Sequence, residues 1–243
     1  MIHYHGLPIT PDTCAIRAVK SGHAFISFAH ASQLGLAIEY CQSFAIDNGA
    51  FTAWMNGKPI TDWEPFYDWA LDVLKFANCD FAVIPDVIDG TEKDNDEMLK
   101  DCPLPIWSSV PVYHMHESLD RLERLINTYP RIALGSSGDF SYVGDSKWWN
   151  RINEMMRIAC YEDGRPKAKM HGLRMLDPAV FTKLPLASAD STNIGRNIGI
   201  DKTWTGSYKP ATKEGRAMVM RERIESENSA TRFLFGAVQE CLF

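Results

Sequence analysis

The sequence lacks any apolar run near the roughly 20 residues that a membrane-spanning helix requires. Its six cysteines are scattered, and neither a Cys-x-Cys nor a Cys-x-x-Cys pair occurs among them. This spacing gives no indication of a disulfide framework or a cysteine-based zinc site. The opening stretch MIHYHGLPIT has neither the basic start nor the apolar core of a signal peptide. We therefore expect a cytoplasmic protein with free thiols, no membrane contact, no metal and no cofactor.

An excess of basic residues is also missing, because 25 Lys and Arg stand against 31 Asp and Glu. The net charge of −6 argues against indiscriminate nucleic-acid binding, which depends on cations that neutralise phosphates. A local basic patch remains compatible with this composition. Internal repeats, low-complexity tracts and linkers are absent, so we expect residues 1–243 to form a single domain.

Short apolar runs alternate with longer amphipathic stretches. Eight runs have the length of strands and the nearly continuous apolar character of parallel strands covered on both faces. They are Ile2–His5, Ala24–Ala29, Ser43–Asp47, Phe81–Asp86, Val110–His114, Arg131–Gly135, Lys169–Leu173 and Leu186–Asp190. Helical spacing of apolar residues marks Thr61–Ala77, Glu117–Thr128, Ser146–Tyr161 and Thr212–Glu227.

This alternation predicts a (β/α)8 TIM barrel. An open doubly wound sheet is the alternative, but no glycine-rich phosphate motif follows the first run. In a barrel the active site gathers at the carboxyl ends of the strands. The predicted strands end on or beside polar residues and glycines, namely His3, His5, His30, Asp47, Asp86, His114, Gly135, His171 and Asp190. The sequence therefore predicts an active site at that end.

Six motifs follow one another in the order FAIDNGAF, IPDVIDG, PVYHMHESLDRL, IALGSSGDF, MHGLRM and SADSTNIGRNIG. This order resembles that of the tRNA-guanine transglycosylase superfamily. It is closest to the short phage-encoded members that exchange guanine in DNA for a 7-deazaguanine derivative. The resemblance implies a pentosyltransferase that needs no cofactor and acts on DNA and a free 7-deazaguanine base. If the protein is phage-encoded, it would work in the host cytoplasm.

The resemblance also implies roles for individual residues. Asp190 would attack the sugar C1′ and form a covalent glycosyl intermediate, and Asp47 would be the general acid and base. Asp86 would accept hydrogen bonds from the guanine N1–H and 2-amino group. The other implied base-binding residues are Asn48, Gly49, Phe51, His114, Gly135, Ser136, Ser137, His171, Gly172 and Met175. The phosphate clamp would consist of Asn193, Arg196 and Asn197, with Lys202, Lys209, Lys213 and Arg216 downstream.

The sequence departs from the family at two points. The tRNA enzymes carry a Cys-x-Cys-x2-Cys…His zinc subdomain, whereas only Cys241 and no histidine follow Gly199 here. We therefore expect a barrel without the zinc subdomain and a substrate that is DNA rather than tRNA. His114 stands where the family has glutamine, so base contacts there must differ.

Other interpretations stay open at this point. Asp47, Asp86 and Asp190 also suit ordinary roles in a turn, a helix cap and a strand end. A second function is a metal-dependent amidohydrolase-like barrel. Its cage would consist of His3, His5, His114, His171 and Asp190. A third is a non-catalytic nucleic-acid-binding barrel, for which the composition supplies no broadly basic surface.

Overall fold

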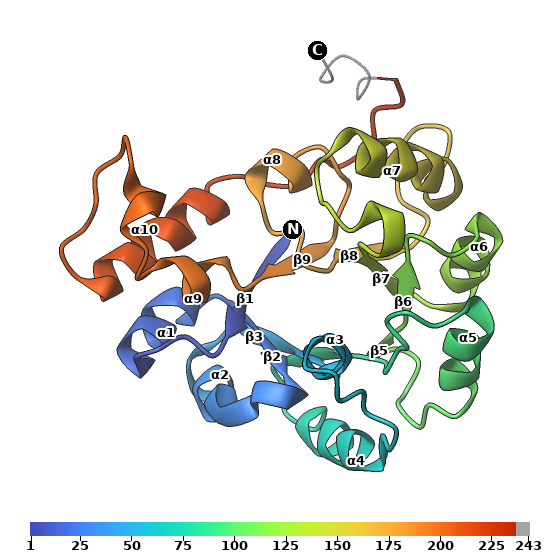
Figure 1. The fold of residues 1–243 in the computed structure, drawn as a ribbon, viewed down its shortest axis with the longest axis horizontal. Helices are drawn as coiled ribbons and strands as arrows, with labels where there is room; N and C mark the ends of the chain where they lie inside the picture. Colours follow the sequence, from blue (N-terminus) through green and yellow to red (C-terminus); the bar gives the residue numbers. More distant parts are fainter. Residues whose placement is uncertain (237–243) are drawn as a thin grey trace.

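The computed structural model describes residues 1–236 and has an α/β fold with a nearly closed barrel of nine parallel strands (Figure 1). Cys241 lies outside the described residues. The strand order is β5-β4-β3-β2-β1-β9-β8-β7-β6. The strands are β1 (Ile2–Leu7), β2 (His23–Ser27), β3 (Ser43–Asp47), β4 (Cys79–Val83), β5 (Ser109–Val110), β6 (Val112–His114), β7 (Arg131–Gly135), β8 (Lys169–Gly172) and β9 (Ser188–Ser191). The barrel-like fold predicted from the apolar runs is confirmed, and the open sheet is not found.

The barrel has an interruption at Pro111. The sequence predicted one strand over Val110–His114, but the structure divides it into β5, which pairs with β4, and β6, which pairs with β7. Proline has no N–H to donate to a ladder, which explains the break between two short strands. The Pro111 carbonyl still accepts a hydrogen bond from Ala133 N–H at 2.9 Å. The chain therefore remains attached to the barrel across the break.

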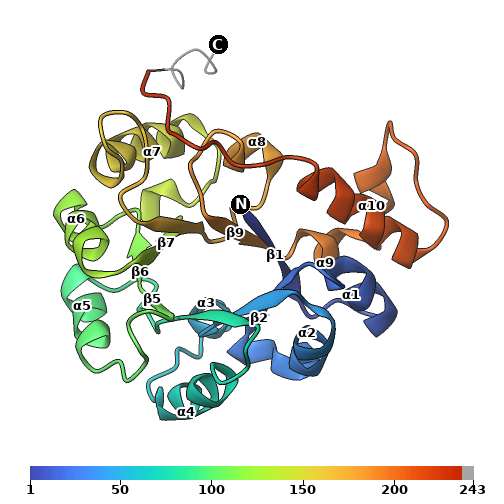
Figure 2. The same ribbon diagram turned by 180° about the vertical axis from the view of Figure 1, so that it is seen from behind.

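Helices surround the barrel (Figures 1 and 2). They are α1 (Asp12–Val19), α2 (Leu34–Tyr40), α3 (Ala50–Met55), α4 (Glu64–Val73), α5 (Glu92–Lys100), α6 (Leu119–Thr128), α7 (Ser146–Ala159), α8 (Pro178–Phe181), α9 (Asn193–Asn197) and α10 (Lys213–Glu225). The four helices predicted from apolar spacing correspond to α4, α6, α7 and α10. Short 3-10 turns cover Phe28–Gln33, Gly138–Phe140 and Asp201–Trp204.

Aromatic side chains fill the inside of the barrel. Tyr4, Phe25 and Phe81 are almost fully buried there and pack against one another. The Tyr4 hydroxyl donates to Asp80 Oδ2 at 2.7 Å, and Arg131 Nη1 donates to the same oxygen at 2.9 Å. Asp80 and Arg131 lie at the amino-terminal ends of β4 and β7, so these contacts close the base of the barrel.

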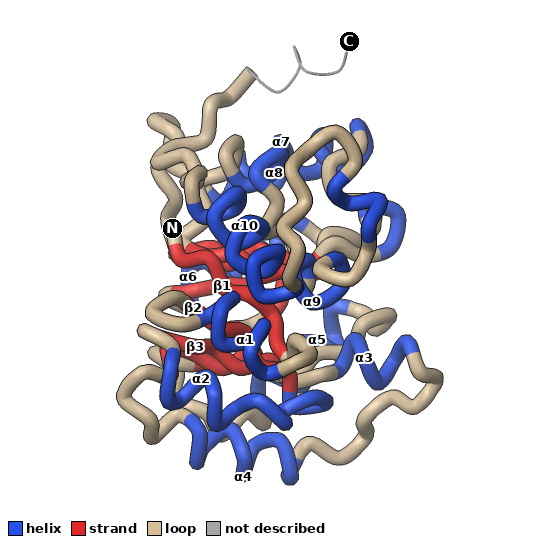
Figure 3. Tube along the Cα trace, turned by 90° about the vertical axis from the view of Figure 1, so that its left-hand side faces the viewer, coloured by secondary structure: helices blue, strands red, loops and turns tan. Residues whose placement is uncertain are grey.

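All strands point to one side of the molecule. In Figure 3, β1 runs from the N-terminus at the left, and α3 and α9 lie to the right, past the strand ends. We call this carboxyl-terminal side of the barrel the mouth. Among the described residues, no helix has the length and apolar character needed to cross a membrane.

Candidate active site

Asp190 lies at the mouth on β9, and only 4% of it is exposed. Its Oδ1 accepts a hydrogen bond from the main-chain N–H of Arg174 at 2.9 Å. The same oxygen lies 3.4 Å from His171 Nε2. A carboxylate held by a main-chain donor on a rigid strand is well placed to act as a nucleophile.

His171 lies on the neighbouring strand β8 and is completely buried. Its ring stacks on Phe25 with centroids 5.3 Å apart, and its Nδ1 lies 2.8 Å from Ser188 Oγ. The ring of His171 is therefore part of the filled interior, and these contacts lend no support to its predicted role in base binding. It supports Asp190 from the inside of the barrel instead.

Asp47 occupies the end of β3 and is partly buried. Burial, together with the neighbouring charges of Asp86 and Asp190, raises its pKa to about 7. The Gly49 N–H donates to Asp47 Oδ2 at 3.1 Å, which opposes that rise. Gly49 has φ +81°, and a Cβ there would lie 3.0 Å from the Ala29 Cβ, so this turn requires glycine. A carboxyl group that titrates near neutral pH suits a general acid and base.

Asn48 and His114 hold Asp86 from two sides. Asn48 Nδ2 donates to Asp86 Oδ1 at 2.9 Å and to the Ile84 carbonyl at 2.8 Å. Asn48 Oδ1 accepts from Ala50 N–H at 2.7 Å, so the amide is fully used within the protein. His114 Nε2 lies 2.9 Å from Asp86 Oδ2. Asn48 was predicted to bind the base, but its contacts make it a positioning residue for Asp86.

Asp86 is not the N-cap of the following helix, since Thr91 caps α5 with Asp94 in a capping box. The helix-cap explanation for Asp86 is therefore wrong. Among residues 1–236, the side-chain contacts of this carboxylate are with Asn48 and His114 at the mouth, and none comes from α5. Its remaining acceptor capacity suits a ligand with paired N–H donors.

The glycine-serine loop follows β7 and lies beside His114, since a Cβ on Gly135 would be 3.7 Å from His114 Nδ1. Both serine hydroxyls are engaged. Ser136 Oγ accepts from the Trp148 indole at 2.9 Å, and Ser137 Oγ lies 2.8 Å from His116 Nδ1. Within residues 1–236, the main-chain N–H groups of Ser136 and Ser137 have no hydrogen-bond acceptor. The loop can therefore offer main-chain donors, but not its hydroxyls.

Phe51 and Arg174 meet at the mouth. The Arg174 guanidinium carbon lies 4.0 Å from the Phe51 ring centroid, a cation–π geometry. Phe51 lies on α3 and is partly buried, whereas Arg174 is exposed. Sequence reasoning missed Arg174, although it lies two residues after the end of β8, within the loops expected to form the site.

The helix α9 begins three residues after Asp190 and carries the predicted phosphate clamp. Arg196 is exposed, whereas Asn193 and Asn197 are partly buried. Asn197 Nδ2 donates to the Asn193 carbonyl at 3.0 Å, so the asparagines stabilise the helix. Of the downstream cations, Lys209 lies 2.9 Å and Arg216 3.7 Å from Asp201 Oδ1. The pairing reduces the charge that these two side chains can offer to DNA.

Two predicted base-binding residues belong to the core instead. Met175 is fully buried and packs in the cluster between the barrel and the helices α6 to α8. Gly172 is needed for that packing, because a Cβ there would lie 2.9 Å from both the Met175 Cβ and the Leu186 Cδ1. These contacts give Gly172 and Met175 a packing role, and they lend no support to the prediction that the two residues bind the base. The nearby Tyr113 is also completely buried, and its hydroxyl donates to the Glu117 carbonyl at 3.0 Å.

The histidines of the amidohydrolase alternative are not brought together. His3 Nε2 lies 3.1 Å from the Glu227 carbonyl, and His5 Nε2 lies 3.0 Å from Glu225 Oε1. Both rings therefore face α10 and the segment after it, on the outside of the barrel. His114, His171 and Asp190 belong to the inside and the mouth. In the part of the chain that the structure describes, no three His, Cys, Asp or Glu side chains are grouped to hold a metal ion.

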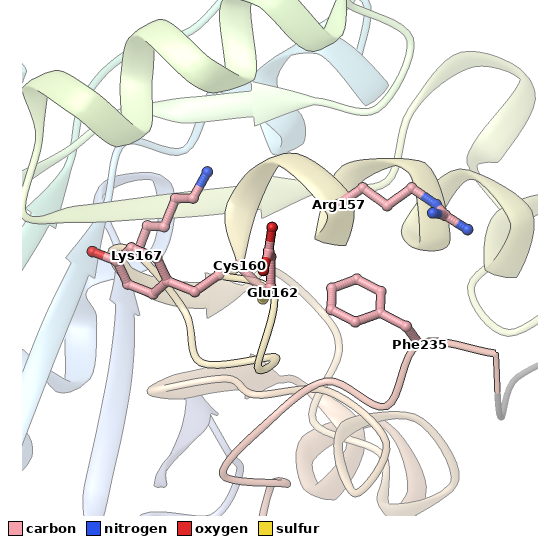
Figure 4. A pocket seen from close by; sticks show the side chains of 6 residues that line it. Arg157, Cys160, Glu162, Lys167 and Phe235 are labelled. Carbon is pink, nitrogen blue, oxygen red and sulfur yellow. The ribbon is translucent and has the colours of Figure 1, made fainter.

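A cavity of about 490 Å³ is lined by a different set of residues (Figure 4). Arg157, Cys160, Glu162, Lys167 and Phe235 line it, together with Tyr161. These residues surround the end of α7 and the approach to β8, which places the cavity at the base of the barrel. Active sites of barrel enzymes lie at the opposite end. The three carboxylates at the mouth are therefore the stronger candidate.

No protein-family model matches the chain, and no curated protein matches it either.

Proposed function

We propose that this protein is a DNA-guanine transglycosylase, a base-exchange enzyme that replaces guanine in DNA with a 7-deazaguanine derivative. The observation that carries the proposal is the pair Asp47 and Asp190 at the barrel mouth. Asp190 is fixed by a main-chain donor, and Asp47 has its pKa raised to about 7 by burial and by the charges of Asp86 and Asp190. Two carboxyl groups in different environments supply a nucleophile and an acid, as glycosyl transfer requires.

In the proposed reaction, an Asp190 oxygen bonds to the sugar C1′ while the bond from C1′ to guanine N9 breaks. The departing guanine takes the proton of Asp47. The incoming 7-deazaguanine then returns a proton to Asp47 as its own N9 attacks C1′, and the bond to Asp190 breaks. Asp190 and Asp47 are both restored, so atoms and charge balance without a metal or cofactor.

Base recognition is assigned to Asp86 and the loop after β7. The Asp86 carboxylate offers acceptors for the N1–H and 2-amino donors of guanine, and adenine has no such pair. The free N–H groups of Ser136 and Ser137 supply donors for the guanine O6. Phe51 provides an aromatic face beside them for stacking, and Arg196 provides a cation for the DNA backbone.

We further propose membership of the tRNA-guanine transglycosylase superfamily, on the order of the six motifs. Counting β5 and β6 as one strand interrupted at Pro111 makes the barrel a (β/α)8 barrel. In this proposal residues 1–243 are one domain without the zinc subdomain. The cytoplasmic location and the phage origin remain proposals of the same kind.

The test is exchange of labelled guanine into single-stranded DNA, duplex DNA and tRNA, run side by side with the Asp190→Asn variant. The expected result is incorporation into DNA by the wild type alone, with a denaturation-resistant protein–DNA adduct. Incorporation only into tRNA would overturn the choice of DNA. Absence of incorporation into all three would overturn the transglycosylase function itself.

A further inference from the structure

Arg174 has an uncommon backbone conformation at the candidate active site. Its φ is +58°, in the left-handed region that residues other than glycine seldom adopt. In this conformation its N–H donates to Asp190 Oδ1 at 2.9 Å. The loop between β8 and α8 therefore fixes the carboxylate and, at the same residue, places a long cationic side chain next to it.

The Arg174 side chain has an aromatic neighbour but no anionic one. Its guanidinium carbon lies 4.0 Å from the Phe51 centroid. Within the described residues 1–236, no carboxylate lies within ion-pair distance of the guanidinium, and no acceptor bonds to it. Arg121 and Arg131, by contrast, each pair with an aspartate at 2.8 and 2.9 Å. An exposed cation–π contact is worth only about 0.5–1 kcal/mol, so a stronger partner can draw the guanidinium away.

A second unpaired cation lies close by. Arg196 on α9 is exposed and, in the described part of the chain, has no carboxylate within ion-pair distance. Desolvation lowers the pKa of Arg174, Arg196 lowers it further, and Asp190 raises it. Two like charges therefore repel each other beside the proposed nucleophile. An anion bound between them would relieve that repulsion.

We propose that Arg174 and Arg196 together bind the DNA phosphodiester that flanks the nucleotide attacked by Asp190. The proposal rests on the function proposed above, and it makes Arg174 a substrate-positioning residue. Phosphates flank the sugar on both sides, so a cation whose main chain touches the nucleophile is placed to reach one of them. Arginine suits this contact because its planar fork binds two phosphate oxygens at once.

The left-handed backbone provides a way to remove the side chain alone. Arg174→Gly keeps the main-chain N–H that holds Asp190, and glycine adopts this conformation without strain. Arg174→Lys keeps the positive charge but loses the planar guanidinium that can bind two phosphate oxygens at once. Arg157→Ala is the matched control, because it removes one exposed positive charge from α7 at the base of the barrel.

The experiment measures kcat and KM for exchange into a single-stranded, guanine-containing oligodeoxynucleotide at several salt concentrations. It also measures oligonucleotide affinity and free-guanine affinity directly. For Arg174→Gly we expect KM and the oligonucleotide Kd to rise about 10-fold or more, with a smaller change in kcat. The salt slope should fall by about one, and free-guanine affinity should be retained. Arg174→Lys should keep the wild-type slope, and Arg157→Ala should match the wild type throughout.

An unchanged KM and salt slope in Arg174→Gly, alongside an active wild type, would overturn the phosphate contact and leave the proposed function standing. An inactive wild type would overturn the proposed function, and the binding measurements would still decide the contact. If Arg174→Gly fails to fold, Arg174→Lys decides. Loss of the bidentate guanidinium should then raise the oligonucleotide Kd several-fold at an unchanged salt slope, and an unchanged Kd would overturn the proposal.

Discussion

Asn48 Nδ2 donates a hydrogen bond to Asp86 Oδ1 at 2.9 Å, so the end of β3 fixes the carboxylate that follows β4. Asn48 has no free polar atom for a ligand, because its other contacts are the Ile84 carbonyl and the Ala50 N–H. The proposed base-recognition site therefore has two parts, the Asn48 amide that positions Asp86 and the Asp86 carboxylate that would bind the base.

Asn48→Ala should weaken binding of free guanine by about 10-fold or more. A hydrogen bond to a charged group is worth about 1.5–3 kcal/mol, and its loss releases Asp86 from the geometry that guanine requires. Isothermal titration calorimetry measures this directly. Asn78→Ala is the control, because its amide binds the Ile38 and Cys41 carbonyls at the base of the barrel. Equal losses in both variants would point to a general effect of destabilisation.

Asp190→Asn should abolish base exchange, with a loss of at least about 10³-fold in rate, while the fold is retained. The amide oxygen can still accept the Arg174 N–H, but the side chain is no longer an anionic nucleophile. Measuring exchange together with thermal unfolding separates the two effects. Exchange near the wild-type rate would rule out Asp190 as the nucleophile.

Asp47→Asn should change how stability depends on pH. The folded pKa of Asp47 is raised to about 7 from 3.8, so the native state binds the proton more tightly than the unfolded state. Wild-type stability should therefore fall as pH rises from about 4 to 7 and level off above that. The variant cannot titrate and should lack this component.

The expected gain of Asp47→Asn over the wild type, between pH 4 and pH 8, is up to about 4 kcal/mol. Chemical denaturation at pH 4, 6 and 8 measures it. Asp72→Asn is the control, because Asp72 is highly exposed on α4. A gain for Asp47→Asn that stays constant with pH would show that Asp47 is ionised in the folded protein throughout this range.

Arg196→Ala should weaken DNA binding and reduce its salt slope by about one, while free-guanine binding survives. The physical reason is that a phosphate contact contributes through counterion release and does not read the base. Titrating a fluorescent oligodeoxynucleotide at several salt concentrations tests this, with Arg157→Ala as the control. Unchanged affinity and slope would require a search for the DNA-binding surface elsewhere on the barrel rim.

Much of the fold could be predicted because the apolar runs and helical spacings are strong local signals. The positions of Asp47, His114 and Asp190 followed from the same signals, since parallel strands bring their carboxyl ends to one side. His3 and His5 show the limit of this reasoning. A period of two places both rings on one face of a strand, but it does not say whether that face is the inside or the outside. The outside position next to α10 depends on tertiary packing.

The detailed arrangement of residues near the mouth was also beyond the reach of sequence patterns. Met175 and Arg174 are adjacent in sequence, yet Met175 is fully buried and Arg174 is exposed beside Phe51. Arg174 adopts the left-handed conformation within a turn that the Met175 N–H closes onto the Gly172 carbonyl at 3.3 Å, and no periodic pattern predicts such a turn at an arginine. The positioning of Asp86 by Asn48 also depends on contacts between residues that follow two separate strands, which sequence patterns do not reveal.

The closed base of the barrel has a consequence for the order of events. Tyr4 and Phe81 fill the interior, and Asp80 with Arg131 closes its lower end, so within the described residues the barrel interior gives a base no second way in. The departing and the incoming base would therefore both pass through the mouth. In the proposed reaction the departing guanine must leave the mouth before the replacement base enters. During this interval the sugar stays covalently bound to Asp190. Double-reciprocal plots for DNA and free base should then give parallel lines, and intersecting lines would mean that both bases occupy the mouth together.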